Sequence, residues 1–206
     1  MKLRYSPTSP YVRKVVMVAI ETGLNERIER LPTMVVPTRV NEEVARENPL
    51  VKVPALTTDD GLVLYDSPVI CEYLDTLHSG PKLFPEAGAP RWIALRHQAL
   101  ADGILDAAIL IRYEGLRPQE CRWADWIDGQ TRKMRGALAQ LDLMLEAGEL
   151  GSGLTIGQIA IGCALGYLDF RFSHEDWRGR HRRLAGWFDD FAQRKSMRDT
   201  VPADPV

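Results

Sequence analysis

Cysteine is scarce in this chain. The three residues, at positions 71, 121 and 163 of 206, form an odd and widely spaced set. Such a set does not suit a disulfide scaffold, and it favours a reducing compartment such as the cytoplasm. Each cysteine falls in an apolar helical pattern, so we expect all three thiols to be buried and inert.

Long apolar runs and a strong charge of either sign are also missing. No stretch approaches the length needed to span a bilayer, and the first residues lack the apolar segment of a signal peptide. The formal net charge of −2 gives no reason to expect a nucleic acid or an anionic membrane as partner. The basic run at 178–183 is therefore interpreted as a solvated loop between helices.

Metal-ligand spacing is absent as well. The four histidines, at positions 78, 97, 174 and 181, are scattered along the chain. Protein metal sites usually draw on ligands at short, regular spacings. The sequence therefore predicts no metal site.

One stretch, residues 48–75, carries the most specific information. Val53, Ala55 and Leu56 look like a strand, yet Pro54 lies inside the run. Proline cannot donate to a strand ladder, so we expect the strand to start after Pro54. The X-Pro bond is where a cis peptide costs only about 0.5–1 kcal/mol, and we predict one at Val53–Pro54. The Val53 backbone would then lie unpaired at a sheet edge, where an extended peptide can bind.

A hairpin and a helix start follow this edge. Asp60–Gly61 is typical of a tight turn before a second strand at 62–65. The pair Ser67–Pro68 predicts a helix with Ser67 as N-cap and proline at the first helical position. A helix N-terminus attracts carboxylates. The stretch therefore predicts a peptide-binding edge beside a carboxylate-binding helix end.

In this order and spacing, the motifs resemble the cytosolic glutathione S-transferases. The resemblance covers nearly the whole chain, and it is sharpest in the first 80 residues. It implies that the Val53 backbone pairs with the cysteinyl part of glutathione, and that Asp66 and Ser67 hold its γ-glutamyl end. The glutathione-binding residues that it implies are Thr8, Lys52, Val53, Pro54, Asp66 and Ser67.

The chain order fits that family's first domain. Residues 2–5 and 28–31 are predicted strands, and residues 38–47 are predicted to form a loose helix. Between the strands, Ser9 is the predicted N-cap of a helix that Gly23 ends. The resemblance implies an α/β thioredoxin-like N-terminal domain over residues 1–79.

A segment rich in helix-breaking residues is followed by helical patterns. Glycines and prolines mark residues 80–90 as a linker, and residues 91–206 are predicted to form an all-α domain. Thr155 and Gln158 have the spacing of a capping box. The helices are expected at 91–116, 120–147, 156–172 and 183–195, with a loop at 151–153. Trp123 and Trp126 are expected to be buried.

Activation of the glutathione thiol needs a group near the first helix. The loop 6–10 contains no cysteine, so a mixed disulfide with glutathione at this position is excluded. It offers three hydroxyls, on Ser6, Thr8 and Ser9. Ser9 is engaged as an N-cap, and Ser6 matches the catalytic position of serine-type members through Ser6–Pro7 and Val12–Arg13. We therefore predict Ser6 as the catalytic residue, with Ser9 next and Thr8 third.

The predicted function is that of a cytoplasmic enzyme that joins glutathione to a small electrophile and so takes part in detoxification. Isomerisation, dehalogenation and peroxide reduction are related possibilities, and a non-catalytic glutathione-binding or scaffolding protein is the alternative. The resemblance implies a homodimer. It also implies a second-substrate pocket beside the first long helix, where Asp102, Asp106, Arg112 and Tyr113 are candidates. The sequence does not name the second substrate.

Overall fold

The computed structural model describes residues 1–151 and 153–204. Ser152, in the loop expected at 151–153, lies outside the described residues. The chain divides into two compact units. One contains residues 1–86 together with 195–206, and the other contains residues 87–194.

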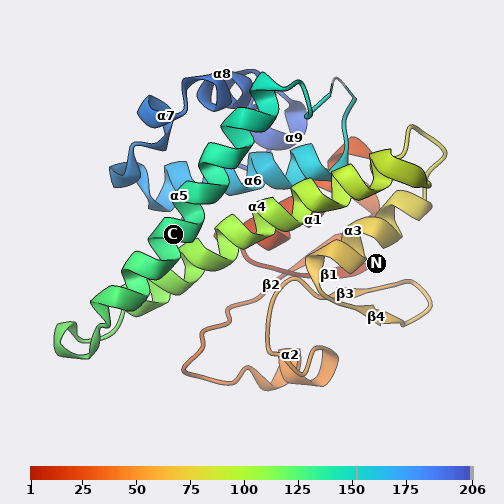
Figure 1. Ribbon diagram of the computed structural model, residues 1–206. Coiled ribbons are helices and arrows are strands. Elements are labelled where there is room, and N and C mark those ends of the chain that lie inside the picture. Colours follow the sequence, from red (N-terminus) through yellow and green to blue (C-terminus); the bar gives the residue numbers. More distant parts are fainter. Residues whose placement is uncertain (152, 205–206) are drawn as a thin grey trace. The chain divides into compact units, whose positions relative to one another are not determined.

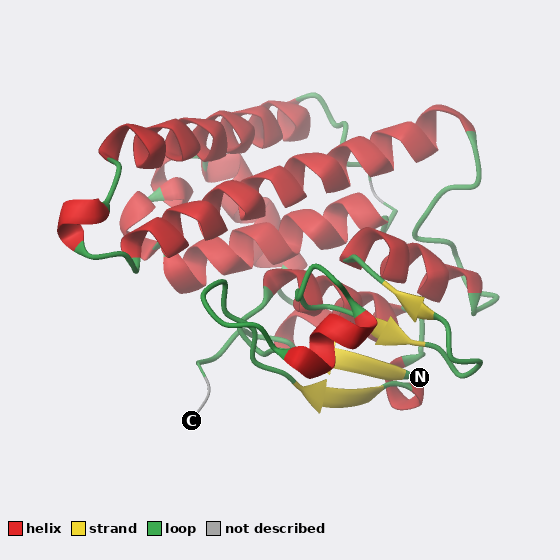
Figure 2. Cartoon of the chain, turned by 90° about the horizontal axis from the view of Figure 1, so that it is seen from below, coloured by secondary structure: helices red, strands yellow, loops and turns green. Residues whose placement is uncertain are grey.

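The first unit is a four-stranded sheet with helices on both faces. Its elements are β1 (Lys2–Tyr5), α1 (Pro10–Glu21), β2 (Glu29–Pro32), α2 (Glu42–Glu47), β3 (Leu56–Thr57), β4 (Val63–Leu64), α3 (Ser67–Thr76) and α9 (Lys195–Arg198). The strand order is β2-β1-β3-β4, with β1 and β2 parallel and the other neighbours antiparallel. Helices α1 and α3 pack together on one face, and α2 lies on the other (Figures 1 and 2). This is the predicted thioredoxin-like arrangement.

The sequence signals at the start of α1 act as expected. Ser9 is the N-cap, and its hydroxyl accepts a hydrogen bond from the Val12 N–H at 3.3 Å. Pro10 takes the first helical position, where a missing N–H costs nothing. The apolar residues Val12 and Val15 are fully buried. Gly23 follows the helix with a φ of 72°, a conformation that glycine adopts without strain.

Two predicted helix starts in the first unit differ from the structure. The loose helix expected at 38–47 forms only over Glu42–Glu47, because Asn41 caps it by accepting the Val44 N–H at 3.2 Å. Helix α3 has Asp66, not Ser67, at its N-cap position, and Ser67 is its first residue. Asp66 makes no side-chain capping bond. Aspartate and serine both favour the N-cap position, so the helix can begin one residue earlier than predicted.

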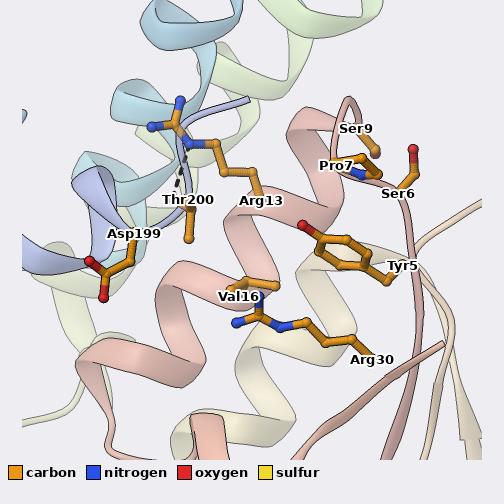
Figure 3. Close-up of a pocket in the computed structure, with 9 residues that line it drawn as sticks. All are labelled: Tyr5, Ser6, Pro7, Ser9, Arg13, Val16, Arg30, Asp199 and Thr200. Carbon is orange, nitrogen blue, oxygen red and sulfur yellow. Dashed lines mark hydrogen bonds between the residues drawn. The ribbon is translucent and has the colours of Figure 1, made fainter. Parts of the chain in front are cut away.

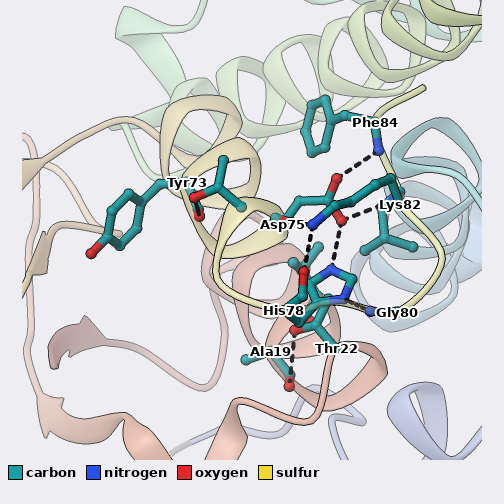
Figure 4. A network of polar contacts seen from close by, with 11 residues as sticks. Ala19, Thr22, Tyr73, Asp75, His78, Gly80, Lys82 and Phe84 are labelled. Atoms are coloured by element: carbon teal, nitrogen blue, oxygen red, sulfur yellow. Dashed lines mark hydrogen bonds and ion pairs between the residues drawn. The ribbon is translucent and has the colours of Figure 1, made fainter. Parts of the chain in front are cut away.

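The end of α3 is tied to the segment that leaves the first unit (Figure 4). The buried Asp75 carboxylate accepts the backbone N–H groups of Leu83 and Phe84 at 2.9 and 3.0 Å. His78 Nδ1 accepts the Gly80 N–H at 3.1 Å. Its Nε2 must therefore carry the hydrogen in the neutral ring, and it donates to Asp75 at 2.9 Å.

The second unit is helical. Its helices are α4 (Gly88–Gly115), α5 (Ala124–Glu146), α6 (Ile156–Arg171), α7 (Trp177–Arg180) and α8 (Arg182–Phe191). Helices α4 and α5 run side by side, and α6 packs along α4 (Figure 1). Every residue of α6 from 156 to 168 is buried, as expected for a helix that is apolar all round. The predicted capping box is present, with the Thr155 N–H bonded to Gln158 Oε1 at 2.6 Å.

Side chains at the junction of α4 and α5 contradict the sequence analysis. Cys121 is exposed, whereas Cys71 and Cys163 are buried as predicted. Trp123 and Trp126 are 61% and 40% exposed, and their rings stack with centroids 6.1 Å apart. A helical pattern predicts burial there, but residues 119–126, which span the connection before α5 and its first turn, are all exposed.

Residues 195–206 belong to the first unit. The sequence instead predicts them in the helical domain, because its last glycine- and proline-rich linker is at residues 80–90. Arg13 on α1 donates to the Met197 carbonyl at 3.1 Å and to the Thr200 hydroxyl at 3.2 Å. The Ser196 hydroxyl bonds to Glu21 at 2.5 Å. These contacts hold α9 against α1, and glycine and proline spacing gives no sign of them.

Candidate functional site

Strand register brings the predicted site residues to one end of the sheet. Leu3 of β1 lies opposite Leu56 of β3, which in turn lies opposite Leu64 of β4. The segment after β1, the segment before β3 and the segment after β4 therefore all lie at the same end of the sheet, and they contain Ser6, Val53 and Ser67 respectively. The Arg4 N–H bonds to the Ala55 carbonyl at 2.9 Å, so the pairing of β1 with β3 begins one residue before the assigned start of β3.

The loop between β1 and α1 presents the three predicted hydroxyls. Ser6 Oγ and Thr8 Oγ1 are 3.3 Å apart and form a hydrogen-bonded pair in which either can donate. Ser9 Oγ instead accepts from the Val12 N–H as the helix cap. All three residues are half-buried. The structure thus separates a paired Ser6 and Thr8 from a Ser9 that serves the helix.

A small hollow lies behind this loop, with a volume of about 20 Å³. That is room for roughly one water molecule. Tyr5, Arg13, Arg30 and Thr200 are among its lining residues. In Figure 3 the Ser6 hydroxyl points away from the side chains of Tyr5 and Arg30. Ser6 and Ser9 also line the hollow, which is too small for a peptide.

The Val53 backbone is available for pairing. The Val53–Pro54 peptide bond is cis, as predicted. Across residues 1–151 and 153–204, no hydrogen bond involves the Val53 N–H or C=O. Lys52 next to it is exposed, while Pro54 is buried. Both backbone groups of Val53 therefore remain unpaired over the described residues.

The start of α3 offers groups for an anion and a cation. Ser67 is 1% exposed as a residue, and within the described chain neither its hydroxyl nor its N–H has a hydrogen-bond partner. Asp66 beside it is exposed, and the Tyr65–Asp66 peptide bond is also cis. First-turn N–H groups and the helix dipole favour a carboxylate at Ser67, and the Asp66 carboxylate favours an ammonium group.

The loop before Val53 contains two residues that the sequence analysis passed over. Asn48 is 1% exposed, and its side chain donates to the Lys52 carbonyl at 3.0 Å and accepts the Leu50 N–H at 3.0 Å. Val51 has a φ of 51°, a left-handed conformation. An asparagine followed by proline is a visible turn signal. A β-branched residue gives no such signal, because it disfavours positive φ.

An ion pair joins this loop's preceding helix to β1. The Arg4 guanidinium bonds to both carboxylate oxygens of Glu47, at 3.0 and 2.6 Å. The hydrogen bond to Glu47 is the largest cause that raises the pKa of Arg4 above its ordinary value, and burial opposes it. Bidentate pairs of this kind fix geometry as well as charge. The C-terminal end of α2 is thereby held to β1.

The other residue types and segments that the sequence analysis considered do not form a second site in the described chain. Among the described residues, no group of His, Cys, Asp or Glu is arranged to hold a metal ion. No described helix is both long and apolar enough to cross a bilayer. The second-pocket candidates all lie on α4, where Asp102 is half-buried and Asp106, Arg112 and Tyr113 are exposed.

Comparison with known proteins gives consistent matches over the chain. The sequence pattern of the glutathione S-transferase N-terminal domain matches residues 8–77, and that of the glutathione S-transferase C-terminal domain matches residues 124–190. The chain is 34% identical over 204 residues to the uncharacterized GST-like protein YibF of Escherichia coli (strain K12), covering 98% of both sequences.

Solved structures agree with these matches. A glutathione transferase family member from Pseudomonas fluorescens Pf-5 with bound glutathione is 47% identical. The match covers 100% of this chain and 99% of that one, with a TM-score of 0.95. A structure of a family member from the same organism with bound S-(propanoic acid)-glutathione is 46% identical, with complete coverage of both chains and a TM-score of 0.90.

Proposed function

Because this chain belongs to the glutathione S-transferase family, we propose that it binds glutathione with Ser6, Val53 and Ser67 and activates the thiol for attack on a small electrophile. The observation that supports the proposal is the Val53 backbone, which is unpaired among the described residues and lies at the same sheet end as the loop after β1 and the start of α3. Val53 and Ser67 have unpaired hydrogen-bonding groups within the described chain. The relative from Pseudomonas fluorescens Pf-5, crystallised with glutathione, supports the ligand.

Each part of glutathione has a partner in this arrangement. The Val53 N–H and C=O pair with the cysteinyl backbone, as a strand edge pairs with a peptide. The Ser67 hydroxyl and N–H take the γ-glutamyl carboxylate, and Asp66 takes its ammonium group. The exposed Lys52 ammonium attracts a carboxylate of the ligand. Pro54 and Thr8 shape the two sides of the cysteinyl position.

Thiol activation needs a modest free energy. A free thiol has a pKa near 8.5, and lowering it by about two units requires roughly 2.7 kcal/mol of preferential thiolate stabilisation. A hydrogen bond to a charged group contributes about 1.5–3 kcal/mol. The N-terminus of α1 adds about 0.3–1 kcal/mol. One hydroxyl beside that helix end is therefore sufficient.

Ser6 is the hydroxyl that we assign to this task, in agreement with a serine-type family member. If Thr8 donates to Ser6 across their 3.3 Å contact, the Ser6 hydrogen remains available for the sulfur. Ser9 is a weaker choice because its oxygen already caps α1. Its own hydrogen is not used by the cap, so Ser9 is the competitor that an experiment must exclude.

The electrophile that we propose is a small molecule with a carboxylate. A relative 46% identical holds S-(propanoic acid)-glutathione, in which the group on sulfur is a short acid. With an α,β-unsaturated acid, the thiolate sulfur bonds to the β carbon and the α carbon takes up a proton. With a halogenated acid, the sulfur displaces halide ion. Both routes conserve the oxidation state of glutathione and consume the thiolate that Ser6 stabilises.

The test combines titration of the bound thiol with turnover. Thiolate absorbance against pH in the glutathione complex should show a lowered thiol pKa in the wild type. Ser6→Ala should raise that pKa by about one unit or more, because a donor to the anion is lost. Ser9→Ala is the matched control and should leave it near the wild-type value. A pKa shift confined to Ser9→Ala would refute the assignment of Ser6.

Turnover separates an enzyme from a binding protein. A panel of unsaturated and halogenated acids should yield thioether products with the wild type, and Ser6→Ala, with its bound thiol pKa raised by a unit or more, should slow product formation about tenfold or more. Glutathione binding with an unshifted thiol pKa and no product would instead indicate the non-catalytic alternative.

Location and assembly complete the proposal. We place the protein in the cytoplasm as a homodimer that detoxifies small electrophiles. The cysteine pattern supports a reducing compartment, since no disulfide occurs in the described part of the chain. The family supports the dimer.

A further inference from the structure

Val51 adopts a backbone conformation that its side chain disfavours. Its φ of 51° lies in the left-handed region, which is open to glycine but costly for a β-branched residue. It is half-buried, and it lies two residues before Val53. Something in the folded chain must hold it there.

Asn48 supplies hydrogen bonds on both sides of Val51. Its Nδ2 donates to the Lys52 carbonyl at 3.0 Å, and its Oδ1 accepts the Leu50 N–H at 3.0 Å. The Asn48 carbonyl also accepts the Val51 N–H at 2.9 Å. One buried residue thus closes the loop from position 48 to position 52 around the disfavoured conformation.

This loop is anchored at its other end to β1. The Asn48 N–H bonds to the Val44 carbonyl at 2.7 Å, which attaches it to the last turn of α2. Glu47 in that turn accepts the bidentate contact from Arg4 of β1. A continuous path of hydrogen bonds therefore runs from β1 through Asn48 to the Lys52 carbonyl, one residue before Val53.

From these contacts we propose that Asn48 is a positioning residue for glutathione. It holds Val51 in the left-handed conformation and so fixes the direction in which the Lys52–Val53 backbone leaves the loop. This inference rests on the proposed pairing of glutathione with the Val53 backbone. Asn48 does not touch the ligand. It changes the affinity for glutathione and leaves the pKa of the bound thiol unchanged.

The prediction is a coupling between positions 48 and 51. In the wild-type background, Asn48→Ala removes the restraint, Val51 relaxes to negative φ, and the Kd for glutathione rises about tenfold. In a Val51→Gly background the same substitution has a smaller effect, at most about threefold, because glycine adopts positive φ without a restraint. The pKa of the bound thiol should be the same in all four proteins.

The experiment measures glutathione binding by calorimetry in the wild type, both single variants and the double variant. Val40→Gly, alone and combined with Asn48→Ala, is the matched control, because Val40 is an exposed loop valine with negative φ. Its combination should be additive. If Asn48→Ala does not fold, Asn48→Asp replaces it in both backgrounds, since it keeps the acceptor for Leu50 and loses the donor to Lys52.

Three results would contradict the proposal, and they are distinguishable. An unchanged Kd in Asn48→Ala, with only a lower melting temperature, would make Asn48 merely structural and overturn the positioning role. Equal losses of affinity in the wild-type and Val51→Gly backgrounds would overturn it as well. Absence of glutathione binding in the wild type would overturn the proposed function, and the positioning role with it.

Discussion

At the scale of single residues, Ser67 is where ligand binding and helix formation are easiest to separate. Its hydroxyl has no partner in the described chain, and Asp66, not Ser67, occupies the N-cap position. Ser67→Ala should therefore weaken glutathione binding by about 1 kcal/mol or more through loss of a donor to an anion. Calorimetry gives the Kd, and Ser79→Ala, at an exposed serine after α3, is the control. An unchanged Kd would show that the Ser67 hydroxyl does not donate to the ligand.

His97 should give the protein a pH-dependent stability. It is 2% exposed on α4, its Nε2 has no partner among the described residues, and burial lowers the pKa of its imidazole. Arg96 lowers that pKa further, and Glu149 opposes both effects. An unfolded histidine titrates near pH 6.5, so below about that pH the unfolded chain binds a proton that the folded chain excludes. Stability should be fully present above this pH and fall as the pH is lowered toward the folded pKa.

The measurement is the free energy of unfolding by denaturant between neutral and mildly acidic pH. His97→Gln should flatten the fall in stability, because no imidazole then has to be kept neutral in the folded state. His174→Gln removes an exposed imidazole and is the control. An equal slope in the wild type and in His97→Gln would contradict the prediction.

Residue types explain which single-residue predictions succeeded. Ser9 could be identified as a cap because a proline follows it at the position where proline is favoured. Asp66 and Ser67 are both good capping residues, so the sequence could not choose between them. The left-handed Val51 was not predictable, since local preference argues against it. Its conformation depends on hydrogen bonds from Asn48.

At the scale of elements, the contact between α4 and α6 depends on one glycine. A Cβ added to Gly157 would lie 2.6 Å from His97 Cβ and 2.9 Å from the Ala94 carbonyl oxygen. Neither atom is the flexible end of a side chain, so the helices would have to move apart. Gly157→Ala should cost about 1–3 kcal/mol of stability, the usual range for overpacking.

Gly136→Ala is the matched control for this prediction. Gly136 lies inside α5, and its added Cβ would meet nothing within 4 Å. The same substitution there should stabilise the protein by about 0.5–1 kcal/mol, because alanine loses less backbone entropy in a helix. Denaturant unfolding of both variants measures the difference. A neutral or stabilising Gly157→Ala would show that α4 and α6 adjust without cost.

Element boundaries were predictable where a local signal sets them. The capping box of α6 was visible as Thr155 and Gln158, and it is present. Gln158 also donates to the Leu150 carbonyl at 2.5 Å, a second role that spacing could not reveal. Strands β3 and β4 are only two residues long. Their pairing depends on neighbours and not on alternation, so the sequence overestimated the length of β4.

At the scale of the whole molecule, the order of motifs was sufficient to predict the thioredoxin-like unit and the helical unit after it. The sequence did not show that α9 returns to the first unit. That return depends on Arg13 bonding to the Met197 carbonyl and to the Thr200 hydroxyl, contacts 184 and 187 residues apart in the chain. Linker composition marks where a chain leaves a unit, and it carries no information about a later return.

The assembly state is the last prediction, and it belongs to this scale. A closed two-fold dimer is the commonest oligomer, and we expect a mass of about twice 23.2 kDa by light scattering at micromolar concentration. We expect the start of α3, from Asp66 to Tyr73, to lie near the seam, as the resemblance to the family implies. Val69 on α3 is 47% exposed and Tyr65 before it is 37% exposed, so this unit presents apolar surface there.

Val69→Glu should shift the protein toward the single-chain mass, because a carboxylate without a partner is costly to bury in an apolar contact. Val40→Glu places the same charge on a valine that is 60% exposed in the loop before α2, and it should leave the mass unchanged. A single-chain mass for the wild type would refute the dimer. A dimeric Val69→Glu would keep the dimer but show that its seam lies elsewhere, because the new charge would then remain in water.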